Sequence, residues 1–240
     1  MEIWHLDLHL DRDTFRRAYA LLDPQERARC ARLRGSLLRH RYAAAHAGLR
    51  RLLARRLRCP PAQVLLARDP GGKPRLRPGP GRPLHFSLAH AGDHALVAMS
   101  AEHAVGVDLE LIPPPVGIRD DLADHLSATE RQALDAMPLG LQALAALRCW
   151  VRKEALLKAS GHGLALAPSG LSMSWGDAAF LLESQLPAYA VGRWVLSAHE
   201  RAGEWTAAAA WAVPTPTRSE VVRWLRWPDD VALIEGQASQ

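Results

Sequence analysis

The chain has 240 residues, of which 30 are Lys or Arg and 25 are Asp or Glu, giving a formal net charge of +5. Hydrophobic residues at 48% and charged residues at 23% exclude wholesale disorder and are enough for one or two domains with a hydrophobic core. No apolar run approaches the roughly 18 residues of a membrane-spanning helix, and residues 1–8 lack the basic-then-apolar pattern of a secretion signal. The three cysteines show no CxxC spacing, which argues against a disulfide framework or a zinc cluster. We therefore expect a globular protein of the cytoplasm.

The charge is divided unevenly along the chain. Residues 1–104 carry 19 basic and 9 acidic side chains, a net charge of +10, whereas residues 105–240 carry 11 basic and 16 acidic side chains, a net charge of −5. Only three of the basic residues are lysines, namely Lys73, Lys153 and Lys158. In a sequence so rich in arginine these positions are candidates for function, against the alternative that they are ordinary surface residues.

The start of the chain is predicted to form a strand and then helices. Residues 2–9 alternate apolar and polar side chains, as a half-buried strand does. A helix is expected over about 13–22. Asp23-Pro24 then supplies a cap and a first-turn proline for one long helical segment that reaches Arg58.

A loop and three strands are predicted to follow. Glycine and proline are dense over 69–83, which predicts a loop. Two strands are expected over 84–88 and 95–100, joined by a turn at 91–94, and another short strand over 105–112.

The second half repeats this mixture. Helices are expected near 118–125, 127–136 and 140–159, and Ser127 with Glu130 forms a capping-box sequence at the start of the second of them. Strand-like runs follow over 171–175, 179–184, 193–200, 205–213 and 220–226. The fold class is therefore α+β, with an N-terminal half (1–104) and a C-terminal half (105–240). No alignable repeat is visible, so internal duplication stays open.

Two acidic residues, Asp108 and Glu110, lie two positions apart in the predicted strand that contains Gly106. In a strand, residues i and i+2 face the same side with their Cα atoms about 7 Å apart. Like charges so close are costly unless a cation lies between them, which favours a hard metal ion. For these five residues alone, a strand that faces solvent is the commoner explanation.

Trp150, Glu154 and Lys158 are spaced four residues apart late in the third predicted helix of the second half and therefore share one face. A Glu–Lys pair at this spacing is also the commonest surface pair of a helix, worth only about 0.2–0.5 kcal/mol. Trp150 is better explained as a core residue. Taken alone, this segment indicates a solvent-facing helix.

Two further segments carry groups that could bind a ligand. The glycine loop at 71–74 presents Lys73 and Pro74, and the predicted strand 86–90 ends in His90. The loop lacks the strand–loop–helix context of a phosphate-binding loop, and a lone histidine at a strand end is usually structural. Each signal is weak by itself.

These four segments occur in the order GKP, a strand ending in histidine, GVDLE and WVRKEALLK. In this order the sequence resembles the 4′-phosphopantetheinyl transferases of the larger, Sfp-like type, by motif over about residues 20–165. The resemblance implies a monomer with internal pseudo-two-fold symmetry. Its two similar α+β halves would each have helices packed on small antiparallel sheets, with the active site at their seam.

The resemblance also implies a reaction and its catalytic groups. The 4′-phosphopantetheine arm of coenzyme A is transferred to a serine of an apo acyl or peptidyl carrier protein, with release of 3′,5′-ADP and with Mg²⁺ as cofactor. Asp108, Glu110 and Glu154 match the family's magnesium ligands. Glu154 also matches the general base, and Lys158 matches the lysine that meets the reacting phosphate. The implied catalytic residues are therefore Asp108, Glu154 and Lys158.

The implied coenzyme-binding residues lie in the basic half. They are Arg29, Arg68, Lys73, Pro74, Ser87 and His90, of which His90 matches a histidine near the 3′-phosphate of the coenzyme's ribose. Many relatives have a serine where this chain has Ala89, so that hydroxyl is missing here. All three lysines fall within motif regions, which favours a function for each. The carrier-facing surface is implied to lie on less regular segments, here 113–126.

Two other functions stay open. The arginine-dense segment 27–58 and an isoelectric point near 9.5 suggest a nucleic-acid-binding module. Only 14 of 240 residues are aromatic, no recognised nucleic-acid motif is present, and the second half is acidic, so we expect neither a nucleic acid nor a membrane as partner. The second alternative is an inactive relative that binds a carrier protein, against which stand the intact acids and lysines of the motifs.

Overall fold

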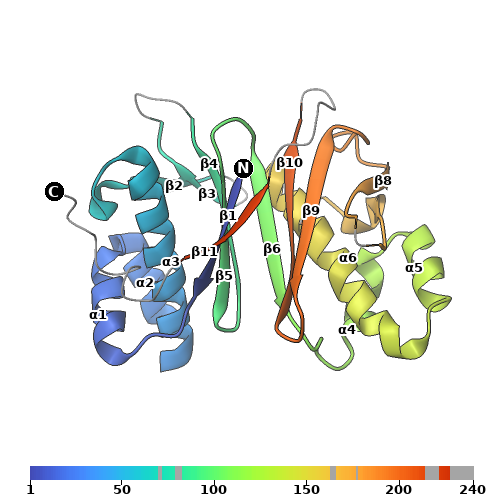
Figure 1. Cartoon of the computed structure of the whole chain (residues 1–240), viewed down its shortest axis with the longest axis horizontal. Helices are drawn as coiled ribbons and strands as arrows, with labels where there is room; N and C mark the ends of the chain where they lie inside the picture. Colours follow the sequence, from blue (N-terminus) through green and yellow to red (C-terminus); the bar gives the residue numbers. More distant parts are fainter. Residues whose placement is uncertain (70–71, 79–82, 163–165, 177, 214–221, 228–240) are drawn as a thin grey trace.

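The computed structural model of the chain describes residues 1–69, 72–78, 83–162, 166–176, 178–213 and 222–227, with strands in the middle and helices on the two outer sides (Figure 1). The helices are α1 (Arg12–Leu21), α2 (Pro24–Arg32), α3 (Ser36–Leu57), α4 (Ile118–Asp121), α5 (Ala128–Asp135) and α6 (Leu139–Ser160), with short 3-10 helices η1 (Pro61–Gln63), η2 (Ala123–His125) and η4 (Pro168–Gly170). The strands are β1 (Glu2–Asp7), β2 (Leu66–Arg68), β3 (Pro74–Leu76), β4 (His85–Ala91), β5 (His94–Ser100), β6 (Val105–Leu111), β7 (Leu171–Met173), β8 (Leu181–Ser184), β9 (Trp194–Arg201), β10 (Trp205–Ala212) and β11 (Arg223–Arg226). The α+β class is confirmed. Within the described ranges, none of the helices has the length and apolar character to cross a bilayer.

Two sheets form the middle of the molecule. One has the strand order β11-β1-β5-β4 and the other β6-β10-β9, and two small hairpins pair β2 with β3 and β7 with β8. All of these pairs are antiparallel except β1 with β11, which run parallel. Strand β4 of the first sheet packs against β6 of the second, and a separate cluster of buried side chains that includes Ile3, Val107 and Trp205 fills the space between the sheets.

The same order of elements occurs twice along the chain. A strand is followed by short helices, a long helix, a 3-10 helix, a small hairpin and two paired strands, first over β1 to β5 and then over β6 to β10. The long helices α3 and α6 have 22 residues each. Each half has a hydrophobic core of its own between its helices and its sheet.

A buried ion pair occupies the corresponding place in both halves. Glu26 and Glu130 each close a capping box at the start of a short helix. The following long helix supplies the cation, with Arg50 Nε at 2.6 Å from Glu26 and Lys153 Nζ at 2.5 Å from Glu130. Both cations also donate to backbone carbonyls at the beginning of, and just after, the next 3-10 helix. The halves therefore repeat one arrangement, although no repeat is visible in the sequence.

The prediction of one long helix up to Arg58 is wrong, because the segment forms two helices. Helix α2 ends at Arg32 and α3 begins at Ser36, with Gly35 between them at φ 92°, a backbone conformation that favours glycine. Leu37 and Leu38, in the first turn of α3, are 54% and 49% exposed.

The prediction of a loop over 69–83 is wrong for its middle part. Residues 74–76 form β3, which pairs with β2 in the register Leu66 opposite Leu76. Glycine and proline composition does not reveal this strand, because pairing with the neighbouring strand β2 decides it. The expected helix over 118–125 is also shorter, with α4 followed by η2. The other predicted helices and strands are confirmed, with ends that differ by a few residues. Residues 220–221 of the predicted strand 220–226, and residues 70–71 and 79–82 of the predicted loop, lie outside the described residues.

Candidate functional site

The first residue of the GVDLE segment brings a strand and a helix into direct contact. A Cβ atom added to Gly106 of β6 would lie 2.0 Å from the carbonyl oxygen of Ala155 and 2.3 Å from the amide nitrogen of Ala159, both in α6. Helix α6 therefore crosses β6 at a distance that only glycine allows. We call this contact the β6–α6 crossing.

The β6–α6 crossing places the two charged pairs of the sequence beside each other. Asp108 and Glu110 extend from β6, and Glu154 and Lys158 extend from α6. The Nζ atom of Lys158 lies 2.5 Å from Asp108 Oδ1 but 3.8 Å from Glu154 Oε2. The closer ion pair of Lys158 thus joins two elements and is not the helix-surface pair that the i, i+4 spacing suggests.

These groups line a cavity of about 370 Å³, which we call the acidic pocket. Its wall consists of Leu88, Ala89, His90, Asp108, Leu109, Glu110, Trp150, Glu154 and Lys158. The pocket lies where β4 of the first half meets β6 and α6 of the second. Trp150, which the sequence suggested as a core residue, is only partly buried and lies beside the ring of His125 with the centroids 4.7 Å apart.

The electrostatics of the acidic pocket disfavour its negative charges. Burial raises the pKa of Asp108, although the nearby Lys158 ammonium opposes the shift. Burial and the neighbouring Asp108 raise the pKa of Glu110, and burial also raises the pKa of Glu154. Burial would lower the pKa of Lys158, but Asp108, Glu154 and Glu110 together outweigh it, and the pKa of Lys158 is raised. A site with these shifts favours a second cation.

The donors of the acidic pocket fit a hard metal ion by their chemistry. Asp108 Oδ2 is buried and, within the described part of the chain, has no hydrogen-bond partner. An unpaired buried carboxylate oxygen is costly and is a natural ligand for a cation such as Mg²⁺. No group of three or more His, Cys, Asp or Glu side chains among the described residues is already arranged as a metal cage, since the Lys158 ammonium lies against Asp108.

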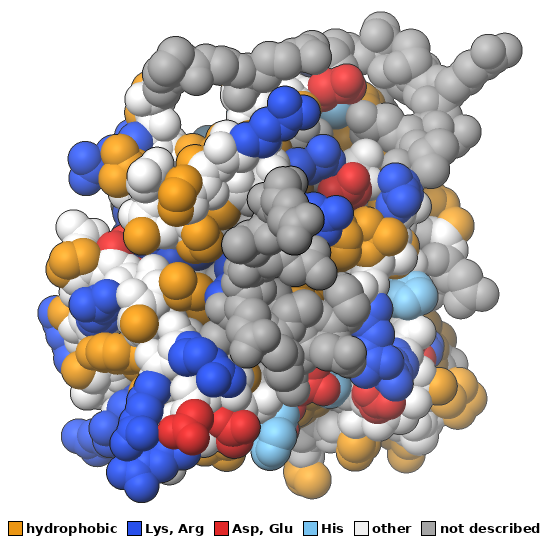
Figure 2. All heavy atoms as spheres, turned by 60° about the vertical axis from the view of Figure 1, so that its left-hand side comes forward, with side chains coloured by type: hydrophobic (Ala, Val, Ile, Leu, Met, Phe, Trp, Pro, Cys, Tyr) orange, Lys and Arg blue, Asp and Glu red, His pale blue; other side chains and the backbone are white. Residues whose placement is uncertain are grey.

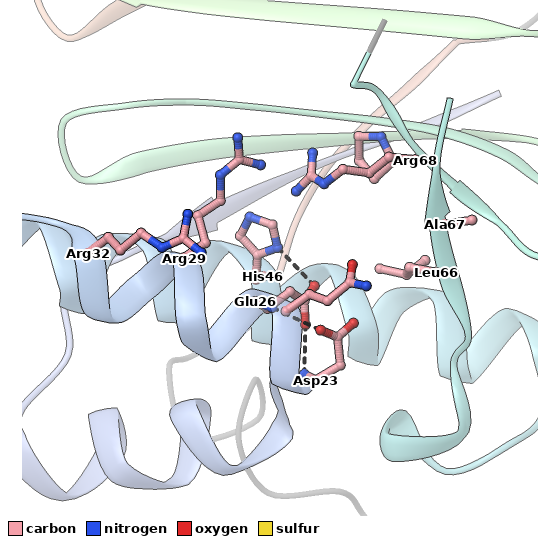
Figure 3. Close-up of a pocket in the computed structure, with 10 residues that line it drawn as sticks. Asp23, Glu26, Arg29, Arg32, His46, Leu66, Ala67 and Arg68 are labelled. Atoms are coloured by element: carbon pink, nitrogen blue, oxygen red, sulfur yellow. Dashed lines mark hydrogen bonds and ion pairs between the residues drawn. The ribbon is translucent and has the colours of Figure 1, made fainter. Parts of the chain in front are cut away.

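A second cavity, of about 300 Å³, lies in the first half, and we call it the arginine pocket. It is lined by Asp23, Gln25, Glu26, Arg29, Arg32, His46, Leu66, Ala67, Arg68 and Pro74. Figure 3 shows the arginines of α2 and Arg68 of β2 on opposite sides of it, with His46 between them. The structure therefore brings the predicted residues Arg29, Arg68 and Pro74 together.

The acidic residues of the arginine pocket, Asp23 and Glu26, are paired with neighbouring side chains. His46 Nδ1 lies 3.0 Å from Glu26 Oε1, and Arg50 bonds both Glu26 and Asp23 at 2.6 Å. Arg29, Arg32 and Arg68 supply positive charge to the pocket wall, and Arg68 Nη1 also donates to the carbonyl oxygen of Gly72 at 2.7 Å. On the face that Figure 2 brings forward, the visible Lys and Arg side chains lie in several groups beside hydrophobic and acidic ones.

His90 lines one of the two pockets and responds to charges of both. It lines the acidic pocket at the end of β4. Desolvation, His46 of the arginine pocket and Lys158 of the acidic pocket all lower its pKa. The ring of His90 therefore lies close enough to one group of each pocket for its pKa to respond to both charges.

Two predicted coenzyme-binding residues are engaged elsewhere. The Oγ atom of Ser87 accepts a hydrogen bond of 3.2 Å from the amide of Val107, between β4 and β6. The Nζ atom of Lys73 donates to the carbonyl oxygens of Val105 at 2.8 Å and Lys158 at 2.6 Å. Neither residue lines the acidic pocket or the arginine pocket.

Lys153 is the lysine for which the expectation of a functional role fails. Its side chain is fully buried at 0% exposure, with Nζ bonded to Glu130 and to the carbonyls of His125, Pro168 and Leu171. It stabilises the core of the second half and lies outside both pockets.

Sequence reasoning missed Arg32, His46 and the role of Gly106. No motif marks Arg32 or His46, because they reach the arginine pocket from two different helices. Gly106 could have been found as the glycine of a buried strand, which often marks a close approach of another backbone.

Comparisons with known proteins show similarity to one family of enzymes. Residues 104–210 match the model of the 4′-phosphopantetheinyl transferase superfamily. A Synechocystis protein whose name provisionally assigns it as a 4′-phosphopantetheinyl transferase is 33% identical over 60% of this chain and 59% of its own length. A phosphopantetheinyl transferase of Thraustochytrium is 32% identical over 62% of this chain and 55% of its own length. The 4′-phosphopantetheinyl transferase HetI of Nostoc is 29% identical over 69% of this chain and 70% of its own length. The matched part thus spans little more than half of the first two relatives.

Proposed function

Because the chain belongs to the 4′-phosphopantetheinyl transferase superfamily, we propose that it transfers the 4′-phosphopantetheine arm of coenzyme A to a serine of an apo carrier protein and releases 3′,5′-ADP. The observation that carries this proposal is the convergence of Asp108, Glu110, Glu154 and Lys158 on one pocket next to a second, arginine-lined pocket. The first has the charges for phosphoryl chemistry, and the second has the charges for the coenzyme's nucleotide.

The transfer needs charge neutralisation and alignment, because a serine hydroxyl is a weak nucleophile and a diphosphate repels electron-rich groups. Lys158 is suited to meet the transferred phosphate, since Asp108 raises its pKa and keeps it charged. Glu154 is suited to accept the serine proton, because its raised pKa brings it closer to the working pH of a general base. Asp108, Glu110 and Glu154 would hold Mg²⁺, which when bound neutralises phosphate charge.

The coenzyme is proposed to extend from the arginine pocket past His90 to the acidic pocket. Arg29 and Arg68, with Pro74 beside them, would hold the nucleotide end in the arginine pocket. The diphosphate would reach the acidic pocket past His90. The carrier is proposed to approach along 113–126, where His125 contacts Trp150 of the pocket wall and Val116 is fully exposed.

We propose that a single chain is the active unit, because the residues of both pockets come from one copy. It also includes a reducing compartment such as the cytoplasm, which the three free cysteines support. The nature of the carrier, whether from fatty acid, polyketide or nonribosomal peptide synthesis, is decided by the experiment that follows.

We test the proposed function by incubating the protein with coenzyme A, Mg²⁺ and a panel of apo acyl and peptidyl carriers, and measuring intact carrier mass. At least one carrier is expected to gain the mass of a phosphopantetheine arm. No gain on any carrier of the panel contradicts the proposal. Salt-dependent retention on DNA, measured in parallel, tests the alternative of a nucleic-acid-binding module.

Replacing His90 with alanine is expected to separate recognition of the 3′-phosphate from binding of the rest of the coenzyme. A lost charge-assisted hydrogen bond weakens coenzyme A binding about tenfold or more. Binding of 3′-dephospho-coenzyme A, which lacks that phosphate, is expected to change much less. Titration calorimetry with both ligands measures the difference, and equal losses would remove His90 from the 3′-phosphate.

A further inference from the structure

One ammonium group joins the glycine loop of the first half to both elements of the β6–α6 crossing. Lys73 Nζ donates to the carbonyl oxygen of Val105, the first residue of β6, at 2.8 Å. It also donates to the carbonyl oxygen of Lys158, in the last turn of α6, at 2.6 Å. Val105 directly precedes Gly106, so both bonds are made at the crossing itself.

The loop that presents Lys73 is fixed by Asp69. Asp69 Oδ1 accepts a hydrogen bond of 2.8 Å from the backbone amide of Lys73, and the carbonyl of Asp69 accepts one of 2.9 Å from Gly72. The Lys73 side chain is half-buried, and burial lowers its pKa to about 8 while Asp69 opposes the shift. The chain therefore keeps a cation at a place where it loses hydration, and protein carbonyls replace the lost water.

The two acceptors are groups whose position matters for the acidic pocket. The last four carbonyls of a helix have no partner within the helix, so a donor from outside can fix the end of α6. The Val105 carbonyl lies at the start of the strand that carries Asp108 and Glu110. The Lys73 side chain thus fixes the position of α6 relative to β6 at the end of the crossing that carries Lys158.

We infer that Lys73 is a positioning residue, which holds the Lys158 turn of α6 against the start of β6 and so aligns the acidic pocket. This inference rests on the proposed function. It differs from the direct coenzyme contact that the family resemblance implies for this lysine. An ammonium has three N–H donors, and two of them are directed at protein carbonyls, which leaves at most one for a phosphate.

The kinetic test compares Lys73→Met with Arg29→Ala in the transfer assay. Loss of alignment lowers kcat, because a small misplacement of reacting groups costs about tenfold to a hundredfold in rate. Lys73→Met is therefore expected to lower kcat at least about tenfold while the KM for coenzyme A changes less than about threefold. Arg29→Ala, at a side chain of α2 that lines the arginine pocket, provides the contrasting signature of raised KM with kcat retained.

Three results would overturn the inference. A KM increase for Lys73→Met like that of Arg29→Ala, with kcat retained, would show that Lys73 contacts the coenzyme. A lower unfolding midpoint with unchanged kcat and KM in the folded enzyme would show a role in stability alone. Unchanged values throughout would show no role.

Hydrogen exchange provides a readout that does not depend on activity. In Lys73→Met the amides of residues 155–160 and 105–107 are expected to exchange faster, whereas those of the matching last turns of α3, residues 52–57, keep their wild-type rates. Unchanged exchange at 155–160 contradicts the inference. If the wild-type protein transfers nothing to any carrier, the proposed function fails, and exchange still decides whether Lys73 fixes the crossing.

Discussion

Replacing Gly106 with alanine is expected to destabilise the folded chain by at least about 3 kcal/mol. The added Cβ atom would lie 2.0 Å from the Ala155 carbonyl oxygen and 2.3 Å from the Ala159 amide nitrogen. Both are backbone atoms of α6, which cannot rotate away as a side chain can. Helix and strand must therefore separate, and this widens the pocket that holds Asp108 and Lys158. Urea unfolding followed by circular dichroism measures the loss, and the transfer assay measures its consequence.

The matched control is the same substitution at Gly140, near the start of α6. No heavy atom lies within 4 Å of a Cβ added there, and alanine has a higher helix propensity than glycine by about 1 kcal/mol. Gly140→Ala is therefore expected to keep or slightly raise the free energy of unfolding. A Gly106→Ala protein as stable as the Gly140→Ala protein would contradict the close crossing. If Gly106→Ala yields no folded protein while Gly140→Ala does, that result also supports the close contact of β6 and α6 at Gly106.

Replacing Lys153 with methionine is expected to cost about 3–5 kcal/mol of stability. The substitution leaves Glu130, which is 1% exposed, with a buried charge and no cationic partner. It also removes a donor from three backbone carbonyls. The midpoint of urea unfolding measures the loss. Because Lys153 lines neither pocket, the fraction that remains folded is expected to bind coenzyme A as the wild type does.

A double-mutant cycle with Glu130→Gln tests whether the pair is the cause. The glutamine removes the buried charge but keeps one acceptor oxygen, so it can retain one of the two backbone hydrogen bonds that Glu130 accepts, at Oε2 from Ser127 and at Oε1 from Met173. Lys153→Met with Glu130→Gln is therefore expected to lose at least about 1 kcal/mol less than the sum of the single losses. Losses that simply add would contradict a direct coupling of the two side chains.

Local spacing predicted which functional groups share a face, but it could not predict which faces meet. The i, i+2 spacing put Asp108 and Glu110 together, and the i, i+4 spacing put Glu154 beside Lys158. The two pairs meet only because α6 crosses β6 at Gly106, a contact between segments about fifty residues apart. This is why each motif alone indicated solvent-facing residues, whereas the family resemblance, which rests on both motifs together, indicated a site.

The predictions that failed did so where tertiary contacts override the local pattern. Composition over 69–83 indicated a loop, but pairing with β2 makes 74–76 a strand. The rarity of lysine suggested one role for three residues. Lys153 instead pairs with a buried glutamate, and Lys73 bonds backbone carbonyls, while Lys158 lines the acidic pocket. None of these environments can be read from residue type or spacing.

The uneven charge of the chain has a mixed structural origin. Part of the excess of arginine in the first half lines the arginine pocket, as Arg29, Arg32 and Arg68 do. Another part is structural, since Arg50 is 1% exposed and pairs with Glu26 and Asp23. Net charge along the chain therefore indicated the half that we propose binds the coenzyme, but not the residues that bind it.

The most direct test of the account compares wild type with Asp108→Asn on the carrier that responds best, by intact mass and by calorimetry with coenzyme A. Asp108 bonds Lys158 and has a second carboxylate oxygen that is buried without a partner among the described residues. With the wild-type protein, we expect the carrier to gain the mass of the phosphopantetheine arm. With Asp108→Asn we expect transfer lowered at least about a thousandfold, with the fold intact by circular dichroism and the arginine pocket still able to bind coenzyme A. Transfer by a folded Asp108→Asn protein at the wild-type rate would contradict the account.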